Sequence, residues 1–365
     1  MIVRKDRILI LLFVAVLIVP VLAYPFLYSH LDTGNHENRT LAEFPDIGSG
    51  FAFFDGVTEW FNDHLPYKNQ MVALHSELFL SLFDSTPNPR VVIGEDGWLF
   101  YNNYDAENPI DDIMGKSAFS DEEMDRIGDN LESCADRMEE RDTAFVFLLA
   151  PNKETVCSDL LPGYLRKGMV QMTRADILAE HLAGRDILFV YPKEELEGLK
   201  DGYQLYYRYD THWNRLGGYV GTRSVCDAVG VNLPALTELE IGTGDGYPRD
   251  LSDLAGIGGR CTNDTEFVIR DFFPDVEVRC EDAGGACIWT SDAEDERTVL
   301  VVHDSYYRSM AEYLPKVFRT VIDVDRNYSD LYSVQRYIDE YHPDIVIMEV
   351  VERGIQILLH ENMPY

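Results

Sequence analysis

Residues 144–149 read Ala144-Phe145-Val146-Phe147-Leu148-Leu149, an unbroken apolar run that Pro151 closes. A strand that is apolar at every position is typical of a parallel sheet, because helices cover both faces of such a sheet. We therefore predict a central, fully buried strand over these residues.

The segments around this strand alternate between helical patterns and further apolar runs. Ser120 precedes an acidic first turn, Asp121-Glu122-Glu123, and this capping pattern indicates a helix to about Arg141. The other expected elements are helices over about 173–183 and 216–228, and strands over 187–190, 299–302, 317–322 and 345–350. Such alternation predicts a three-layer α/β/α sandwich with a mostly parallel sheet.

The same patterns divide the chain into an anchor, a lead-in and a main domain. Residues 1–30 are the expected anchor, and residues 31–89 are a helical lead-in rich in Phe and Trp. The main domain spans 90–365 and opens with a hairpin, because apolar residues at 91–93 and 98–100 flank a Gly-containing turn. Residues from about 234 to 296 are rich in Gly and Asp, so we expect an irregular insertion near the site.

The amino terminus carries the features of a membrane anchor. Arg4, Lys5 and Arg7 precede an uncharged apolar run over residues 8–28, and about 20 such residues cross a bilayer as a helix. Basic residues stay on the cytoplasmic side, so we expect a single-pass protein of the cell membrane with its main domain outside the cytoplasm. Val21-Leu22-Ala23 resembles a cleavage site, but the run exceeds an ordinary signal core, so we expect the anchor to be uncleaved.

Composition excludes one class of partner and indicates an oxidising compartment. The 31 Lys and Arg against 64 Asp and Glu give a net charge of −33, which repels phosphate backbones, so no nucleic-acid partner is expected. Six cysteines without a C-x-x-C pair favour disulfides or buried thiols over a metal cluster. We expect Cys261, Cys280 and Cys287 to lie in one local segment that a disulfide cross-links.

Reactive side chains follow several of the expected strands, at the edge where parallel sheets bind ligands. Ser305 follows the run 299–302 at a strand-to-helix turn, where it is either a nucleophile beside backbone N–H groups or a helix N-cap. Asp210 and His212 would supply a general base and the carboxylate that fixes its tautomer. The alternatives are a capping Asp beside an ordinary histidine, or two metal ligands with His303 as the third.

A third place is the turn after residues 144–149, Pro151-Asn152-Lys153. Asn152 would donate a hydrogen bond to a substrate oxygen there, and Lys153 would meet a carboxylate. The alternative is a simple turn, since Pro-Asn pairs favour turns on their own.

Together these segments resemble the SGNH-hydrolase-like proteins of exopolysaccharide O-acetylation, a family that includes AlgJ, AlgX and the DHHW proteins. The resemblance covers most of the chain, through residues 44–45, 60–64, 94–100, 151–153, 304–305 and 351–353. Its most specific segments are Glu37-Asn38-Arg39-Thr40-Leu41-Ala42 and Asp210-Thr211-His212-Trp213-Asn214, which place several uncommon choices in a fixed order.

The resemblance implies a catalytic triad of Ser305 as nucleophile, His212 as base and Asp210 as orienting carboxylate. Asp-x-His precedes the serine, as in that family, whereas ordinary SGNH hydrolases have their serine first. No cofactor and no metal ion are expected.

The oxyanion hole is expected to differ from that of ordinary SGNH hydrolases. Their Gly and Asn have no plain equivalent at residues 323–325 and 349–353, and His303 replaces the Gly that usually precedes Asp-Ser. The hole would then rest on backbone N–H groups of Ser305 and Tyr306, helped by Arg353. A sugar-stacking platform or, equally, core packing accounts for the aromatic side chains Tyr203, Tyr206, Tyr207, Tyr209 and Trp213.

The implied function is an extracytoplasmic O-acetyltransferase that moves an acetyl group through a serine acyl-enzyme to a cell-surface or secreted polysaccharide. The implied acetyl donor is a membrane-bound O-acyltransferase. Two alternatives stay open: a carbohydrate acetylesterase with the same triad, and a non-catalytic glycan-binding or assembly protein.

Overall fold

The computed structural model describes residues 4–31, 34, 40–83, 85–103, 107–282, 286–326 and 331–360. The chain forms two compact units. We call Met1–Pro89 with Ser252–Thr262 the N-terminal unit, and Arg90–Leu251 with Asn263–Tyr365 the α/β unit. Glu37, Asn38 and Arg39 of the lead-in motif lie outside the described residues.

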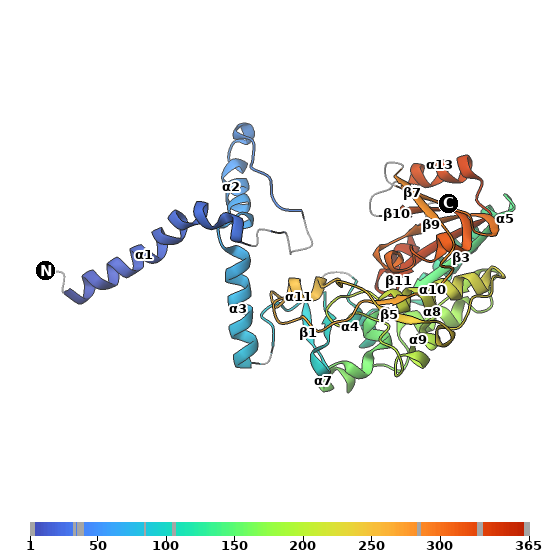
Figure 1. The fold of residues 1–365 in the computed structure, drawn as a ribbon, viewed down its shortest axis with the longest axis horizontal. Helices are drawn as coiled ribbons and strands as arrows, with labels where there is room; N and C mark the ends of the chain where they lie inside the picture. Colours follow the sequence, from blue (N-terminus) through green and yellow to red (C-terminus); the bar gives the residue numbers. More distant parts are fainter. Residues whose placement is uncertain are drawn as a thin grey trace. The chain divides into compact units, whose positions relative to one another are not determined.

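The described part of the N-terminal unit includes the helices α1 (Arg4–Leu27), α2 (Ala52–Asp63) and α3 (Lys68–Phe83) (Figure 1). The first is long and apolar enough to cross a membrane, and its apolar side chains are exposed, so it fits a single-pass anchor. Lead-in residues pack on α2: the Ala42 amide donates to Asp63 at 2.8 Å, and the Phe44 and Trp60 rings meet edge to face.

The α/β unit is built on a seven-stranded sheet with the order β4-β3-β11-β9-β10-β8-β7 (Figure 1). Five parallel neighbours are β4 (Leu188–Val190), β3 (Ala144–Ala150), β11 (Ile345–Val351), β9 (Asp295–His303) and β10 (Phe318–Asp325). Antiparallel strands β8 (Ala286–Ser291) and β7 (Val278–Asp282) complete one side. The registers Val351↔Ala150 and Asp325↔His303 bring the carboxyl ends of the parallel strands to one edge.

Successive side chains of the central strands enter two separate apolar layers, as the alternation of a strand requires. On one face, Val146 and Leu148 of β3 pack with α10 (Arg215–Ala228). On the other face, Phe145 and Phe147 pack with helices α5 (Asp121–Glu139), α8 (Arg174–Leu182) and α13 (Leu331–Tyr341). The predicted three-layer α/β/α sandwich with a mostly parallel sheet is confirmed.

Shorter elements complete the α/β unit. A hairpin pairs β1 (Val91–Ile93) with β2 (Leu99–Tyr101). A second two-stranded antiparallel sheet pairs β5 (Ile241–Thr243) with β6 (Phe267–Ile269). The short helices are α4 (Pro109–Ile113), α6 (Lys153–Val156), α7 (Gly163–Arg166), α9 (Lys193–Leu199) and α12 (Leu314–Val317), and α11 (Asp250–Leu254) crosses from one unit to the other.

Residues 234–296 are more regular than the expected insertion. Two of their strands, β7 and β8, extend the main sheet, and the Cys280–Cys287 disulfide joins them. Cys261 is not part of this cross-link, because it is buried in the N-terminal unit. The other described cysteines, Cys134, Cys157 and Cys226, are buried thiols.

Candidate active site

Ser305 lies at the carboxyl end of β9, on the turn into the short 3-10 helix η6 (Ser305–Ser309). Asp304, not Ser305, caps this helix, since its Oδ1 accepts a hydrogen bond from the Tyr306 amide at 3.0 Å. Asp304 Oδ2 accepts from the Val351 amide at 2.8 Å and from Arg326 at 3.1 Å. Because Asp304 fills the capping role, the Ser305 hydroxyl is available for chemistry.

His212 and Asp210 lie on a loop, and contacts of the neighbouring residues hold its backbone in place. Tyr206 and Trp213 pair as an antiparallel bridge across this loop. Asn214 then caps α10 by accepting hydrogen bonds from two amides of its first turn. The start of α10 therefore fixes the backbone directly after the Asp-x-His motif.

Two side chains join the His212 loop to the Ser305 turn. Trp213 donates from Nε1 to the Tyr306 carbonyl at 2.8 Å, and Tyr306 donates from its hydroxyl to the Thr211 carbonyl at 2.8 Å. Both side chains are fully buried, so water does not compete for these hydrogen bonds. This reciprocal pair brings together two segments that lie far apart in the sequence.

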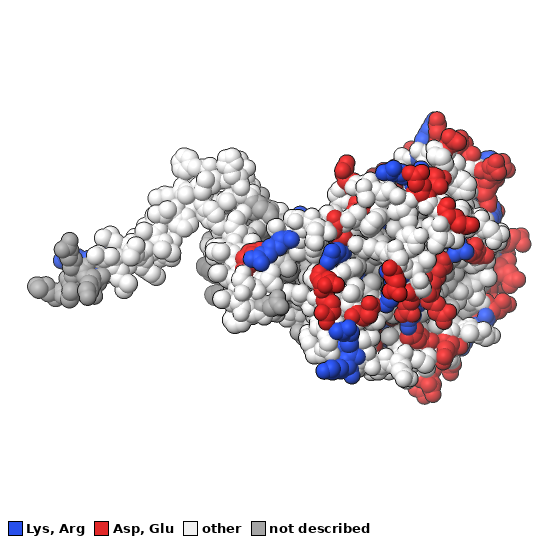
Figure 2. All heavy atoms as spheres, turned by 60° about the horizontal axis from the view of Figure 1, so that its bottom comes forward, with Lys and Arg blue, Asp and Glu red and all other residues white. Residues whose placement is uncertain are grey.

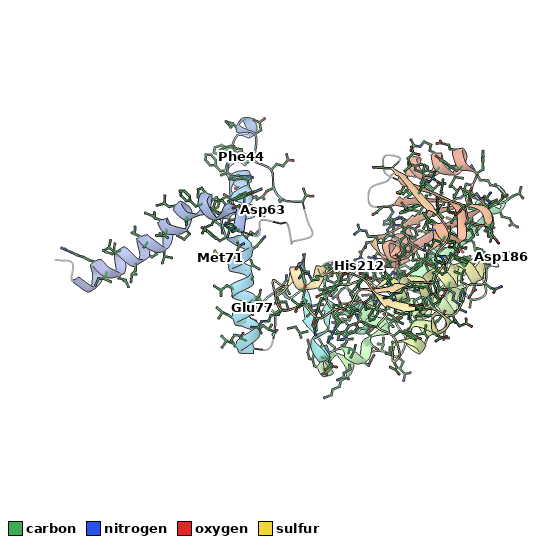
Figure 3. All side chains as sticks on the ribbon, viewed as in Figure 1. Phe44, Asp63, Met71, Glu77, Asp186 and His212 are labelled. Atoms are coloured by element: carbon green, nitrogen blue, oxygen red, sulfur yellow. A yellow bond between two sulfur atoms is a disulfide. The ribbon has the colours of Figure 1, made fainter. Side chains whose placement is uncertain are left out.

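A chain of short hydrogen bonds links Ser305, His212 and Asp210. His212 Nε2 lies 2.7 Å from Ser305 Oγ, and His212 Nδ1 lies 2.6 Å from Asp210 Oδ1. An ionised carboxylate only accepts, so Nδ1 carries the proton and Nε2 is left to accept from the Ser305 hydroxyl. His212, labelled in Figure 3, stays 20% exposed, while Asp210 is only 3% exposed. The serine and the imidazole can therefore contact a substrate, while the carboxylate of Asp210 is shielded from solvent.

The surroundings hold Asp210 in its ionised form. Its Oδ1 accepts from the His212 amide at 3.0 Å, and its Oδ2 accepts from the Asp250 amide at 2.9 Å. Burial by itself raises the pKa of Asp210, but the charge of His212 and these hydrogen bonds outweigh burial and hold the pKa below its ordinary value. Burial lowers the pKa of His212, and the charge and hydrogen bond of Asp210 outweigh it, so this pKa lies above 6.5.

Asp250 is a residue of this site that the sequence analysis missed. Its carboxylate accepts from the Thr211 amide at 2.9 Å and from the Thr211 hydroxyl at 2.7 Å. Burial and the nearby Asp210 raise the pKa of Asp250 to about 6. No motif surrounds Asp250, and its only signal in the sequence is its place in the segment expected near the site.

The side chains that could bind a metal ion are not the set expected from the sequence. Ligand atoms of Asp210, His212 and Asp250 lie within 4.8 Å of one another, and His303 is not among them. His303 Nδ1 instead faces the Asp304 carbonyl at 2.7 Å, and its ring packs on Tyr307. A cation bound by Asp210, His212 and Asp250 would compete with the proton on His212 Nδ1 that orients the imidazole.

Two of the three expected oxyanion residues, Tyr306 and Arg353, have different environments. Tyr306 is fully buried, and its amide is already bound to Asp304, so it is not free to stabilise an oxyanion. Arg353 is half-buried and is the second residue after β11. It donates to the Tyr306 hydroxyl at 3.3 Å and stacks on the Tyr306 ring. Arg353 therefore remains a candidate for charge stabilisation, whereas Tyr306 is a positioning residue.

Asn152 and Lys153 do not face a substrate, because both side chains are fully buried. Lys153 donates to the carbonyls of Leu99, Arg208 and Asp210 at 2.6, 3.0 and 3.0 Å, rather than to a carboxylate. Three carbonyls satisfy the three protons of the ammonium, and they tie the Asp210 loop to β2. We find no partner for the side-chain amide of Asn152 among the described residues.

The proposed platform of aromatic side chains belongs to the core. Tyr206, Tyr207, Tyr209 and Trp213 are buried, so they offer no ring face to a sugar. Only Tyr203 is partly exposed. Trp213 supports the site through its hydrogen bond to Tyr306 rather than through substrate contact.

Comparison with known proteins places the chain in a family. The model of the SGNH hydrolase-like domain of the acetyltransferase AlgX matches residues 91–281, which contain Asp210 and His212 and end before Ser305. A curated relative from Pseudomonas syringae pv. tomato, named "Probable alginate O-acetylase AlgJ", is 24% identical over 194 residues. That alignment covers 49% of this chain and 43% of the relative, so the chain matches less than half of the relative's length.

Solved structures share the fold. Bacillus cereus PatB1 has a TM-score of 0.53 and 15% identity, covering 74% of this chain and 99% of its own. A DHHW family protein from Eubacterium siraeum has a TM-score of 0.53 and 16% identity, covering 75% of this chain and 96% of its own. The α/β sandwich is thus shared with proteins whose sequences have diverged widely.

Proposed function

The chain belongs to the family of the SGNH hydrolase-like domain of the acetyltransferase AlgX, and we propose that it is an extracytoplasmic polysaccharide O-acetyltransferase. The observation that supports this proposal most is the hydrogen-bond chain from Ser305 through His212 to Asp210. It lies at the carboxyl edge of a mostly parallel sheet, where α/β proteins bind ligands. The exposed apolar helix α1 fits a tether to the membrane.

In the first half-reaction, Ser305 Oγ attacks the acetyl carbonyl carbon of the donor. His212 Nε2 takes the hydroxyl proton, and the resulting imidazolium is stabilised by the Asp210 carboxylate. The bond from the acetyl carbon to the donor oxygen then breaks, and His212 returns the proton to that leaving oxygen. The product is an acetyl ester on Ser305.

In the second half-reaction, a sugar hydroxyl attacks the acetyl carbon of that ester. His212 takes the hydroxyl proton and delivers it to Ser305 Oγ as the ester bond breaks, which restores the free serine. The same site catalyses hydrolysis if water enters instead of the sugar. A membrane-bound O-acyltransferase would supply the acetyl group, since the proposed site lies outside the cytoplasm.

Product analysis tests this proposal. The full-length protein in detergent is incubated with para-nitrophenyl acetate, with and without an oligosaccharide acceptor. We expect nitrophenol release and an acetylated oligosaccharide. Nitrophenol and free acetate without acetylated sugar would identify an esterase, and the absence of both products would identify a non-catalytic protein.

Replacing Arg353 tests its role in charge stabilisation. Oxyanion donors contribute about 10²- to 10³-fold to kcat, so Arg353→Ala is expected to lower kcat for ester cleavage by about that factor. KM is expected to change little, because the negative charge develops only in the transition state. Arg353→Lys keeps the charge and should recover part of the loss. An unchanged kcat in Arg353→Ala would remove Arg353 from the mechanism.

The pH dependence of ester cleavage tests the role of His212 as base. The pKa of His212 lies above 6.5, and the base form is lost as pH falls through it, so kcat/KM should fall on the acid side with a midpoint above 6.5. The charge of Asp250 contributes to this upward shift of the pKa. Asp250→Asn keeps a carbonyl oxygen for Thr211 and should move the midpoint downward. A midpoint that stays in place or rises in this variant would contradict the assignment.

A further inference from the structure

One face of α3 exposes a continuous stripe of apolar side chains. Its members are Met71, Leu74, Leu78 and Leu82, which recur at intervals of three or four residues and so share one face of the helix. All four side chains are more than half exposed. We call them the α3 stripe. Contiguous apolar side chains on a surface mark a site of contact with a protein or a membrane.

The opposite face of α3 is covered by residues 252–262 of the same unit. Ser76 lies about half a turn from the stripe and is buried. Gly256 packs against it so closely that a Cβ on Gly256 would lie 2.9 Å from the Ser76 hydroxyl. Arg260 pairs with Glu77 at the edge of this face. The chain thus covers the polar face of α3 and leaves the stripe exposed.

Tyr67, the residue before α3, joins this helix to α1. Its carbonyl accepts from the Met71 amide at 2.8 Å, so it belongs to the first turn. Its hydroxyl donates to the Pro20 carbonyl at 3.1 Å, and its ring meets the Tyr24 ring edge to face at 5.6 Å. Tyr67 precedes Met71 by four residues and continues the spacing of the stripe. The contact with α1 is therefore made in line with the stripe.

This contact sets the depth of α3 relative to α1. The apolar run of α1 ends at Tyr28. At the helical rise per residue, Tyr24 lies about 6 Å and Pro20 about 12 Å before that end. When α1 crosses a bilayer, both residues lie in the outer part of a hydrocarbon core about 30 Å thick. Helices that lie on a membrane bury their apolar face by about 5–10 Å at this boundary, so the start of α3 is at the depth of such a helix.

The rest of the N-terminal unit has the same apolar character. On and just before α2, the aromatic side chains Phe51, Phe54 and Phe61 are also more than half exposed. Figure 2 shows acidic side chains gathered over the α/β unit, whereas the N-terminal helices present mainly uncharged atoms. Phe, Trp and Leu are typical of the lipid-facing side of helices that lie on a membrane. The N-terminal helices therefore suit lipid better than water.

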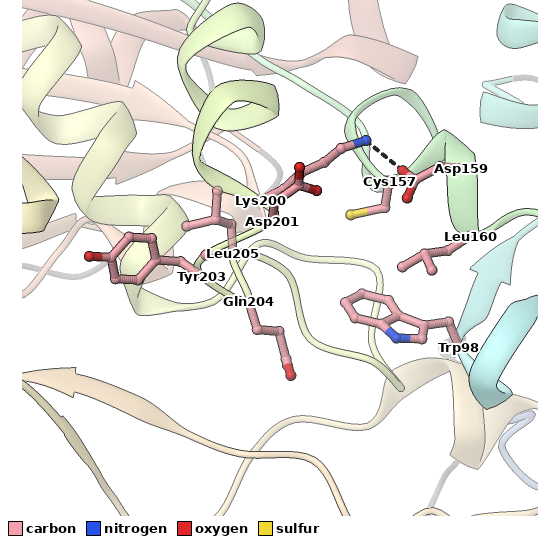
Figure 4. Close-up of a pocket in the computed structure, with 10 residues that line it drawn as sticks. Trp98, Cys157, Asp159, Leu160, Lys200, Asp201, Tyr203, Gln204 and Leu205 are labelled. Atoms are coloured by element: carbon pink, nitrogen blue, oxygen red, sulfur yellow. Dashed lines mark hydrogen bonds and ion pairs between the residues drawn. The ribbon is translucent and has the colours of Figure 1, made fainter.

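The hollow of about 360 Å³ in the α/β unit is a poorer place for lipid (Figure 4). Trp98 lines it, but so do the polar side chains of Asp201 and Gln204. Lys200 and Asp159 form an ion pair in the same lining. An acyl chain would take water away from these groups without replacing its hydrogen bonds, which is costly. The α3 stripe presents no such groups to an acyl chain.

From these observations we infer that α3 lies in the plane of the membrane surface at which α1 ends, and that its stripe inserts into the phospholipid bilayer that α1 crosses. The partner is the lipid itself, bound through its acyl chains, because the stripe carries no charge that would select a headgroup. The inference depends on α1 as a membrane helix. It is independent of the proposed acetyltransferase activity.

The accessibility of a spin label tests this inference. Leu78→Cys is labelled with a nitroxide in the full-length protein, which is then reconstituted in phosphatidylcholine vesicles. Oxygen dissolves in hydrocarbon, whereas a nickel chelate stays in water, so we expect the label to collide more often with oxygen than with the chelate. Leu12→Cys in α1 should give the same result. The matched control is Tyr164→Cys, at an exposed aromatic residue of α7, which should give the reverse.

A second variant tests the stripe as a whole. Leu74→Asp with Leu82→Asp places a charge on each side of the label at position 78 and should move it into water, so that the chelate becomes its more frequent partner. Both positions are exposed, so this variant should fold and should cleave para-nitrophenyl acetate at the rate of the protein labelled at position 78 alone.

Several outcomes would overturn the inference. A label at position 78 that prefers the chelate lies in water, and one that meets neither probe is covered by protein, either a second copy or another part of this chain. An unchanged result in the double Asp variant, or a label at position 12 that prefers the chelate, would contradict it equally. Loss of ester cleavage in every protein would contradict the proposed function and leave the result of the label unaffected.

Discussion

The Ser305→Ala variant is expected to lose ester cleavage and acetyl transfer by a factor of about 10⁴ to 10⁶ in kcat, as serine enzymes do when their nucleophile is removed. Among the described residues, the side-chain hydrogen bond that this change removes is the one to His212, at 2.7 Å. The Asp304 cap and the Tyr306 hydroxyl bond are both left in place, so the turn should keep its conformation. The loss would then be chemical rather than structural.

The matched control for this variant is Ser224→Ala. Ser224 is a half-buried serine of α10 whose hydroxyl donates to the Val220 carbonyl, away from the site. We expect it to cleave para-nitrophenyl acetate at the rate of the unmodified protein. The double variant Ser305→Ala/His212→Ala should be no slower than Ser305→Ala, because the two side chains act as one unit. Full cleavage by Ser305→Ala would place the nucleophile elsewhere.

The second large effect is expected for Asp210→Asn, which should lower kcat by about 10⁴-fold. Two backbone amides and the His212 ring all donate to the Asp210 carboxylate. An Asn side chain has one oxygen, so its NH₂ group meets an N–H donor whichever way the amide is turned. The imidazole then loses its orientation and the charge that stabilises it as a cation.

Asp210→Asn also has a signature that a purely structural defect would not produce. Since the Asp210 charge helps to raise the pKa of His212, its removal should move the acid side of the residual kcat/KM profile to lower pH. Asp186→Asn, an exposed change away from the site, serves as the control with unchanged kcat and profile. A kcat close to that of the unmodified protein in Asp210→Asn would contradict the role given to this carboxylate.

The sheet and the place of Ser305 at its carboxyl edge were predictable for the same physical reason, whereas the triad of Ser305, His212 and Asp210 was implied by the family resemblance. Strands buried on both faces are continuous apolar runs, and the runs over 144–149, 299–302 and 345–350 all became central strands. Parallel strands in one sheet end at one edge, so Ser305 after β9 belongs at the edge where ligands bind. The Asp210-x-His212 loop reaches this edge through the paired contacts of Trp213 and Tyr306.

Other features depend on contacts that a sequence does not display. Strand β7 carries Arg279, Glu281 and Asp282 and is mostly exposed, so no apolar run revealed it. Lys153 was expected to meet a carboxylate, because lysines are seldom fully buried. Three backbone carbonyls from distant segments make its burial tolerable. Asp250 likewise reaches Thr211 only through the folded chain.

The aromatic residues around the motif illustrate the same limit. Tyr206 and Trp213 suit either a sugar platform or a core, because their rings are apolar and each has a polar group that needs a partner. In the structure each finds a carbonyl, Pro151 for Tyr206 and Tyr306 for Trp213, so both rings are buried. Only the positions of these carbonyls decide between the two roles.

Trapping the acyl-enzyme tests the central claim most directly. The full-length protein is mixed briefly with para-nitrophenyl acetate, quenched in acid, digested and analysed by mass spectrometry, beside the His212→Ala variant. The account predicts one acetyl group on the peptide that contains Ser305, and none on that peptide in His212→Ala. An acetyl group on another residue, or nitrophenol release with no acetylated Ser305 at any time point, would contradict it.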